Sequence, residues 1–163
     1  MRIGTWNLAG RWSGTDPHPA SAHVSVGDLH VCSSVLPWRS AGTLWPGPGN
    51  DVGSRTQAAV EPLVGALPAG LTVWGGDWNH ALEGRETAGS ASGREAIRTA
   101  LAQLDLRAVT ASLPHRLDGL SSIDHIAVPT AAAKVEASRR IQMSVDGRSL
   151  SDHDAYVTAI DWT

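Results

Sequence analysis

Four short segments of this sequence carry polar side chains that can bind a metal ion or transfer a proton. They are Thr5–Leu8, Gly75–Asn79, Ile123–Ile126 and Ser151–Asp154. Irregular backbone at the ends of strands can direct such side chains into a common cleft. Carboxylate and amide oxygens beside an imidazole can hold a divalent cation and move a proton near neutral pH. We therefore expect the four segments to form one active site.

Each segment taken alone also has a structural interpretation. Asn7 is a common turn residue, and Asp77 or Asn79 could bind backbone amides as a cap. Ser151–His153 could form a solvated turn, and Asp124 could belong to a buried ion pair. A carboxylate inside an apolar strand costs free energy unless it finds a partner, so Asp124 needs an explanation most. The set of four segments, rather than any one of them, favours chemistry.

The chemistry that fits these side chains is the hydrolysis of a phosphoester. Negative charge that grows on the phosphate oxygens must be met by a cation and by preplaced donors, such as Asn79 and His153. Asp77 is the candidate base for the attacking water, and it points to the same side as Asn79 if the backbone there is extended. Asp124 would fix the tautomer of His153 and favour its protonated form.

The segments resemble motifs of the endonuclease/exonuclease/phosphatase superfamily. This superfamily includes deoxyribonuclease-I-like nucleases, abasic-site endonucleases, inositol-phosphate phosphatases and sphingomyelinases. The motifs are TWN at 5–7, GDWN at 76–79 in place of the more usual GDFN, SIDHI at 122–126 and SDHDA at 151–155, in the family's order. The resemblance implies an α/β fold, a two-sheet α/β sandwich with outer helices, and an active site at one end of the sheets. It also implies a metal-dependent phosphoesterase whose substrate is a nucleic acid or a small phosphorylated molecule.

The resemblance implies a role for each catalytic candidate. Asp77 looks like the group that orients or deprotonates the attacking water, and Asn79 is similar to the neutral donor that steadies the pentacoordinate phosphorus. His153 resembles the imidazole that faces the scissile phosphate, and Asp124 the carboxylate that holds this imidazole. Asp152 resembles a metal-site residue.

The metal expected at this site is Mg²⁺ or Mn²⁺, because oxygen ligands and a phosphate suit these ions. Asn7 is the second metal-site candidate. The family normally adds a Glu about thirty residues after this Asn, but no Glu precedes Glu61 here. The family also places a His at the end of a central strand, where this chain reads Cys32–Pro37. Two later acids could in principle replace the missing Glu, namely Glu83 and Glu86.

Periodicity predicts the elements that must position these residues. We expect helices at Ser54–Leu67, with Ser54 as cap and a kink or early stop at Pro62, and at Gly93–Leu104. Strands are expected at Arg2–Leu8, Ala22–Val26, Leu29–Leu36, Leu71–Trp74, Leu106–Thr110, Ser121–Val128, Val135–Val145 and Ala155–Trp162. The second and third strands form a hairpin around Gly27-Asp28, and Asp77 lies just past the end of the fourth.

The loop Pro37–Gly53 is long enough to form a functional rim. Trp38 and Arg39 in this loop are the candidate substrate-binding residues, although the loop could also be a plain connector. Histidines 18, 23 and 30 lie outside the motifs, and we expect His23 and His30, on the hairpin strands, to be surface or packing residues.

Composition indicates one globular domain, residues 1–163, because 42% of the residues are hydrophobic and 18% are charged. Thirteen basic residues against sixteen acidic ones do not favour tight binding to duplex DNA. A lone cysteine, Cys32, in an apolar run indicates a buried thiol in a reducing compartment. The start has no leader pattern and no window is apolar enough to span a bilayer, so we expect an unexported, cytoplasmic protein. The sequence does not set an oligomeric state.

Three hypotheses about function therefore stay open. The first is an active, compact phosphoesterase. The second is a catalytically weak or inactive family member that binds a phosphate-bearing ligand or a partner through the long loop, with Arg39, Arg55, Trp38 and Trp45 as contacts. The third is an internally shortened gene product that keeps the motifs but folds poorly.

Overall fold

A computed structural model describes residues 16–163 of the chain. Asn7 and the strand expected at Arg2–Leu8 lie outside the described residues. The main element of the described part is a five-stranded mixed sheet with the strand order β1-β2-β3-β5-β4. Its strands are β1 (Ser21–Val26), β2 (Leu29–Ser34), β3 (Thr72–Asp77), β4 (Leu106–Ala108) and β5 (Asp124–Pro129).

The predicted hairpin is confirmed, because β1 and β2 pair antiparallel from Val26↔Leu29 outward. Gly27 has a φ of 59°, which a two-residue hairpin turn requires at its first central position and which glycine adopts without strain. Cys32 on β2 is buried, as expected.

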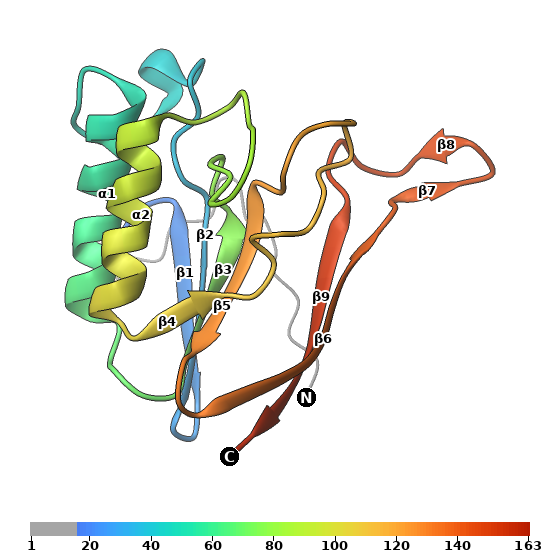
Figure 1. Cartoon of the computed structure of the whole chain (residues 1–163). Helices are drawn as coiled ribbons and strands as arrows, with labels where there is room; N and C mark the ends of the chain where they lie inside the picture. Colours follow the sequence, from blue (N-terminus) through green and yellow to red (C-terminus); the bar gives the residue numbers. More distant parts are fainter. Residues whose placement is uncertain (1–15) are drawn as a thin grey trace.

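Two helices cover one face of this sheet, α1 (Val52–Ala66) and α2 (Ala91–Gln103) (Figure 1). The cap predicted for the first helix was wrong. Asp51 is the cap, since its carboxylate accepts from the Ser54 backbone, and Ser54 closes the capping box from the third helical position. α1 continues past Pro62 to Ala66, so the proline does not stop it early. It also links the parallel strands β2 and β3, the usual use of a crossover helix.

The Leu71–Trp74 strand is longer than predicted, because β3 runs through Gly75 and Gly76 to Asp77. Gly75 is paired with both neighbouring strands, opposite Ser33 of β2 and Ile126 of β5. Gly76 is paired with β5, opposite His125. Gly76 has a φ of 136°, and a Cβ there would overlap a backbone carbonyl of β2. Glycine therefore allows β3 to lie close to β2 at the point where the strand carries Asp77.

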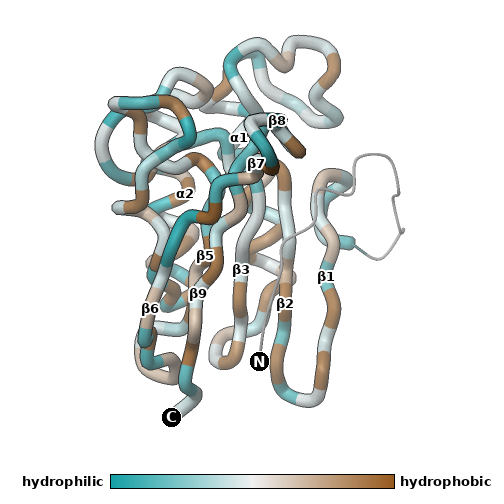
Figure 2. Tube along the Cα trace, turned by 90° about the vertical axis from the view of Figure 1, so that its right-hand side faces the viewer, coloured by the Kyte–Doolittle hydropathy of each residue, from teal (hydrophilic) through white to brown (hydrophobic). Residues whose placement is uncertain are grey.

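A long antiparallel hairpin forms the second layer, on the other face of the main sheet (Figure 1). It consists of β6 (Ala133–Ile141) and β9 (Ala155–Trp162), and β9 contacts β5. The strand predicted at Val135–Val145 is divided, since a small hairpin of β7 (Ser144–Val145) and β8 (Arg148–Ser149) follows β6. Figure 2 views the molecule from the side of the β6–β9 hairpin, with β3, β2 and β1 in succession beside it.

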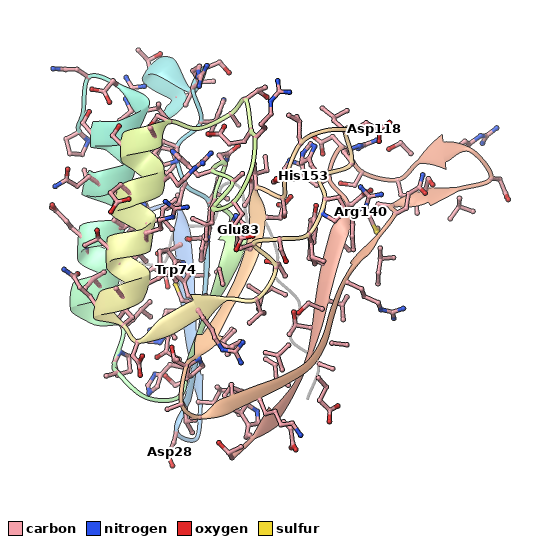
Figure 3. All side chains as sticks on the ribbon, in the orientation of Figure 1. Asp28, Trp74, Glu83, Asp118, Arg140 and His153 are labelled. Atoms are coloured by element: carbon pink, nitrogen blue, oxygen red, sulfur yellow. The ribbon has the colours of Figure 1, made fainter. Side chains whose placement is uncertain are left out.

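The two layers have cores of different size. The larger core lies between the main sheet and the helices and contains Trp74, Trp78, Leu63 and Ile97, with Trp74 under the helices in Figure 3. The smaller core lies between the main sheet and the β6–β9 hairpin, and its buried residues are Val73, Ile126, Val128 and Ala133. Within residues 16–163, neither helix has the length and apolar character needed to cross a bilayer.

Candidate active site

A pocket of about 390 Å³ opens where the ends of β2, β3 and β5 meet the loop before β9. Four predicted site residues from separate parts of the chain line it, namely Asp77, Asp124, Asp152 and His153. Its walls also include Ser33 and Ser34 of β2, Met143, Tyr156 and Val157. The structure thus brings three of the four sequence motifs together, and the fourth lies outside the described residues.

Sheet register places the two carboxylates side by side. Asp77 ends β3 and Asp124 begins β5, and these two residues are partners in the antiparallel ladder. Partners in such a ladder project to the same face. One ligand atom from each of Asp77, Asp124 and His153 lies within 4.8 Å of the other two.

Asp124 holds the imidazole of His153 through a two-oxygen contact. His153 Nδ1 donates to the carboxylate, at 3.0 Å from Oδ1 and 2.9 Å from Oδ2. Its Nε2 therefore faces the other side of the ring, 3.9 Å from Asp77 Oδ2. The hydrogen bond to Asp124 raises the pKa of His153 to about 9, against the opposing effect of partial burial. Near neutral pH this imidazole is a cation that can donate from Nε2.

Asp77, in contrast to His153, is an acidic group in surroundings that disfavour its charged form. Burial and, second, the neighbouring Asp124 raise the pKa of Asp77 to about 7. The backbone amide of Asn79 donates to its Oδ1 at 3.1 Å and partly offsets this effect. A carboxyl that titrates near neutral pH is suited to accept a proton from water.

The donor set fits a hard divalent cation. Four aspartates line the pocket, Asp77, Asp124, Asp152 and Asp154, of which Asp154 is paired with Arg140, and no lysine or arginine is among the described residues that line it. Carboxylate oxygens are the ligands that Mg²⁺ and Mn²⁺ prefer, and clustered carboxylates are stabilised when a cation offsets their repulsion.

Asn79 lies at the edge of the site, and its side-chain amide is engaged. It has a φ of 54°, a left-handed conformation that Asn tolerates better than most residues, and its Nδ2 donates to the Leu36 carbonyl at 3.0 Å. It is not among the described residues that line the pocket. A direct contact between Asn79 and substrate stays a prediction.

The two substrate-binding candidates point elsewhere in this structure. Arg39 Nη2 donates to the Gly89 carbonyl at 2.7 Å, and Trp38 packs edge-to-face against Trp45 with ring centroids 6.5 Å apart. Neither is among the described pocket-lining residues, so their contact with substrate also stays a prediction.

Glu83 and Glu86 do not line the pocket either. Glu83 is exposed, whereas Glu86 accepts from the Gly89 amide at 2.6 Å and lies 3.6 Å from Arg94. The structure therefore gives no support to either as a replacement for the family's metal-binding Glu.

Two side chains around the site were not among the residues predicted to form it. Ser122 Oγ donates to the Asp124 carbonyl at 2.6 Å, and its hydroxyl accepts from the Asp124 amide at 3.2 Å, which fixes the start of β5. Tyr156 lines the pocket while its hydroxyl donates to the Pro114 carbonyl at 3.0 Å. Tyr156 follows Asp154 by two residues at the start of β9, the spacing of side chains on one face of a strand, and this signal was available in the sequence.

Asp154 itself secures the loop that carries His153. Its Oδ1 accepts from the Met143 amide at 3.0 Å and its Oδ2 lies 3.4 Å from Arg140 Nε. Arg140 also donates to the His115 carbonyl, and Figure 3 shows it near His153 at the same end of the β6–β9 hairpin. Arg116 also stabilises this loop, because its Nη1 donates a hydrogen bond to the Ser151 carbonyl at 2.7 Å.

Known structures share this arrangement of elements. A 3′ phosphatase from Neisseria, bound to a product DNA hairpin, gives a TM-score of 0.62 at 17% sequence identity, over 91% of this chain and 67% of that one. An AP endonuclease from Leishmania major gives a TM-score of 0.53 at 11% identity, over 85% of this chain and 53% of that one. No protein-family model and no curated protein sequence matches the chain. The likeness is therefore one of fold, and the chain aligns with about two thirds of the length of the first protein and about half of the second.

Proposed function

We propose, from the deoxyribonuclease-I-like fold that this chain shares with endonuclease/exonuclease/phosphatase structures, that it is a metal-dependent phosphoesterase. The fold implied by the four sequence motifs is confirmed by this likeness. The proposed reaction is hydrolysis of a phosphodiester or phosphomonoester bond by an activated water molecule, in a nucleic acid or in a small phosphorylated molecule.

One observation carries the proposal. Asp77, Asp124 and His153 lie up to 76 positions apart in the sequence (153 − 77 = 76), yet their ligand atoms gather within 4.8 Å at one pocket. A solvated turn or an isolated ion pair does not need a third partner from another strand. A site that binds a cation and a phosphate does, because both kinds of charge must be met in one place.

Each residue of the proposed site has a separate role in the reaction. Asp77 accepts the proton of the attacking water, and the backbone amide of Asn79 holds the Asp77 carboxylate in place. Protonated His153 donates from Nε2 to a phosphoryl oxygen, while Asp124 keeps Nδ1 occupied and the ring oriented. Asp152, with Asn7 as a further candidate, would hold Mg²⁺ or Mn²⁺. A bound divalent cation supplies positive charge for the phosphate oxygens.

The test uses two small substrates, bis-p-nitrophenyl phosphate and p-nitrophenyl phosphate, with Mg²⁺ or Mn²⁺. We expect metal-dependent hydrolysis of at least one, and a loss of about 100-fold or more in Asp77→Asn and in His153→Gln, the usual effect of removing an acid or a base. Asp161→Asn is the matched control, since this exposed carboxylate on β9 lies outside the pocket.

The alternative is a family member that binds phosphate ligands without turnover. Its supporting observation is that no glutamate is among the described pocket-lining residues, where the family uses one for the metal. Inhibitor-like binding of p-nitrophenyl phosphate, with no hydrolysis under either metal, would support this alternative and refute the enzyme. Hydrolysis that survives in both site variants would also refute the proposed roles.

A further inference from the structure

Two histidines outside the pocket face each other across the β1–β2 hairpin. His23 lies on β1 and His30 on β2, one step diagonal to each other in the ladder, because His30 is the direct partner of Ser25. His30 Nδ1 lies 3.4 Å from His23 Nε2, and the rings are stacked with centroids 5.5 Å apart. Both side chains are half-buried, so the two nitrogens are held by their surroundings but solvent reaches them.

The separation of these nitrogens fits chelation better than a mutual hydrogen bond. Hydrogen bonds from N–H groups are usually about 2.7–3.2 Å long, so 3.4 Å is long for one. Two imidazoles that bind one tetrahedral Zn²⁺, each at about 2.0–2.1 Å, place their nitrogens about 3.3–3.4 Å apart. The pair therefore has the span of a two-histidine metal site.

The surroundings supply further oxygen atoms and negative charge. Ser25 Oγ lies 3.0 Å from His30 Nδ1, on the same face of the hairpin. The Asp16 carboxylate accepts from the His23 backbone amide at 3.0 Å, so an acidic side chain lies against the backbone of β1 at His23. A negative charge in this part of the hairpin favours the binding of a cation there.

We propose that His23 Nε2 and His30 Nδ1 form a binding site for a divalent transition-metal ion such as Zn²⁺, Ni²⁺ or Cu²⁺, separate from the phosphoesterase pocket. Imidazole nitrogens select these ions over Mg²⁺, which requires oxygen ligands. The site therefore takes a different class of metal from the one expected at Asp77 and Asp124. Water completes the coordination, as in other sites with few protein ligands.

The bound ion would cross-link an edge strand to its neighbour. β1 is at the end of the sheet and pairs with β2 alone among the described strands. β2 continues from His30 to Ser33 and Ser34, which line the pocket. Metal binding would thus stabilise the strand that forms one wall of the proposed active site, by an amount that grows with the logarithm of the free metal concentration above its Kd.

The experiment must separate this site from the pocket. The starting protein is the Asp77→Asn/His153→Gln variant, treated with a chelator and titrated with ZnCl₂, CuCl₂ or MgCl₂ by calorimetry. We expect one Zn²⁺ or Cu²⁺ bound per chain, and affinity at least 10-fold weaker when His23→Gln or His30→Gln is added, whereas neither addition should change the response to MgCl₂. His115→Gln, at an imidazole of the 109–123 loop, is the matched control and should keep the affinity.

A spectroscopic measurement covers the case in which a histidine variant fails to fold. Electron paramagnetic resonance of Cu²⁺ bound to the starting variant should show coupling to two imidazole nitrogens, with the hairpin unaltered. Coupling to fewer than two, no binding of Zn²⁺ or Cu²⁺, or equal affinity in folded His23→Gln and His30→Gln variants would overturn the proposal. Loss of hydrolysis in the pocket variants does not bear on it, so the two proposals fail independently.

Discussion

Asp124 sets the protonation state of His153, and its replacement by Asn should reverse that state near neutral pH. The Asp124 contacts at 2.9 and 3.0 Å are the first cause of the raised pKa of His153, about 9 against an ordinary value of 6.5. Asp124→Asn removes the negative charge and one of the two acceptor oxygens and leaves partial burial, which lowers the pKa. We expect the pKa of His153 to fall by about two units or more. At pH 7.5 the protonated fraction then falls from nearly all to about a quarter or less.

The assay is a titration of the His153 ring by NMR in chelator-treated protein, which needs no substrate. Asp152→Asn is the control, because Asp152 is the last and smallest of the charges that raise this pKa, and its removal should lower the pKa less. If His153 still titrates near 9 in Asp124→Asn, or if Asp152→Asn has the larger effect, the pairing inferred from the structure is wrong. The sign for activity follows: a protonated donor is lost above its pKa, so the alkaline limit of hydrolysis should move to lower pH in Asp124→Asn.

Three further predictions concern stability. Gly76→Ala should lower the free energy of unfolding by about 3 kcal/mol or more, because a Cβ there overlaps the backbone of β2, whereas Gly65→Ala in open space on α1 should raise it slightly; urea unfolding compares the two. Complete burial lowers the pKa of His125 to about 4, so only the unfolded chain takes up its proton below pH 6.5. Between pH 7.5 and pH 5 the free energy of unfolding of the wild type should then fall by about 2 kcal/mol more than that of His125→Gln. Equal falls in the two proteins would refute this prediction. Arg140→Met should cost about 3 kcal/mol by leaving the buried Asp154 carboxylate unpaired, and adding Asp154→Asn should restore part of that loss in a thermal melt.

Local patterns in the sequence predicted the elements that depend on local interactions. Both helices follow from apolar stripes at helical spacing, and the β1–β2 hairpin follows from Gly27-Asp28 between two β-rich runs. The β7–β8 hairpin could have been predicted too, because Asp146-Gly147 is a common hairpin turn and both residues have positive φ, 51° and 75°. It was missed because the surrounding residues continue the β pattern of β6.

Features that depend on distant parts of the chain could not be predicted in this way. A Gly-Gly pair usually ends a strand, but Gly75 and Gly76 continue β3 because β2 and β5 supply partners about 40 to 50 positions away. The motifs located Asp77, Asp124 and His153. The register of β3 and β5 then brings the two carboxylates together, and the loop before β9 adds the imidazole. The orientation of the Asn79 amide depends on the Leu36 carbonyl, a backbone group whose position no sequence pattern indicates.

The unequal cores have a consequence for how the site opens. Asp77 and Asp124 lie on the main sheet, which the helices cover with the larger core, whereas His153 and Asp152 precede β9, whose hairpin adds a smaller one. Cooperative units with less buried apolar surface open at lower free energy than the whole molecule. Transient detachment of the β6–β9 hairpin would therefore separate the imidazole from both carboxylates while the helices and the main sheet stay folded. The lifetime of the assembled site is then set by this partial unfolding and not by the global transition.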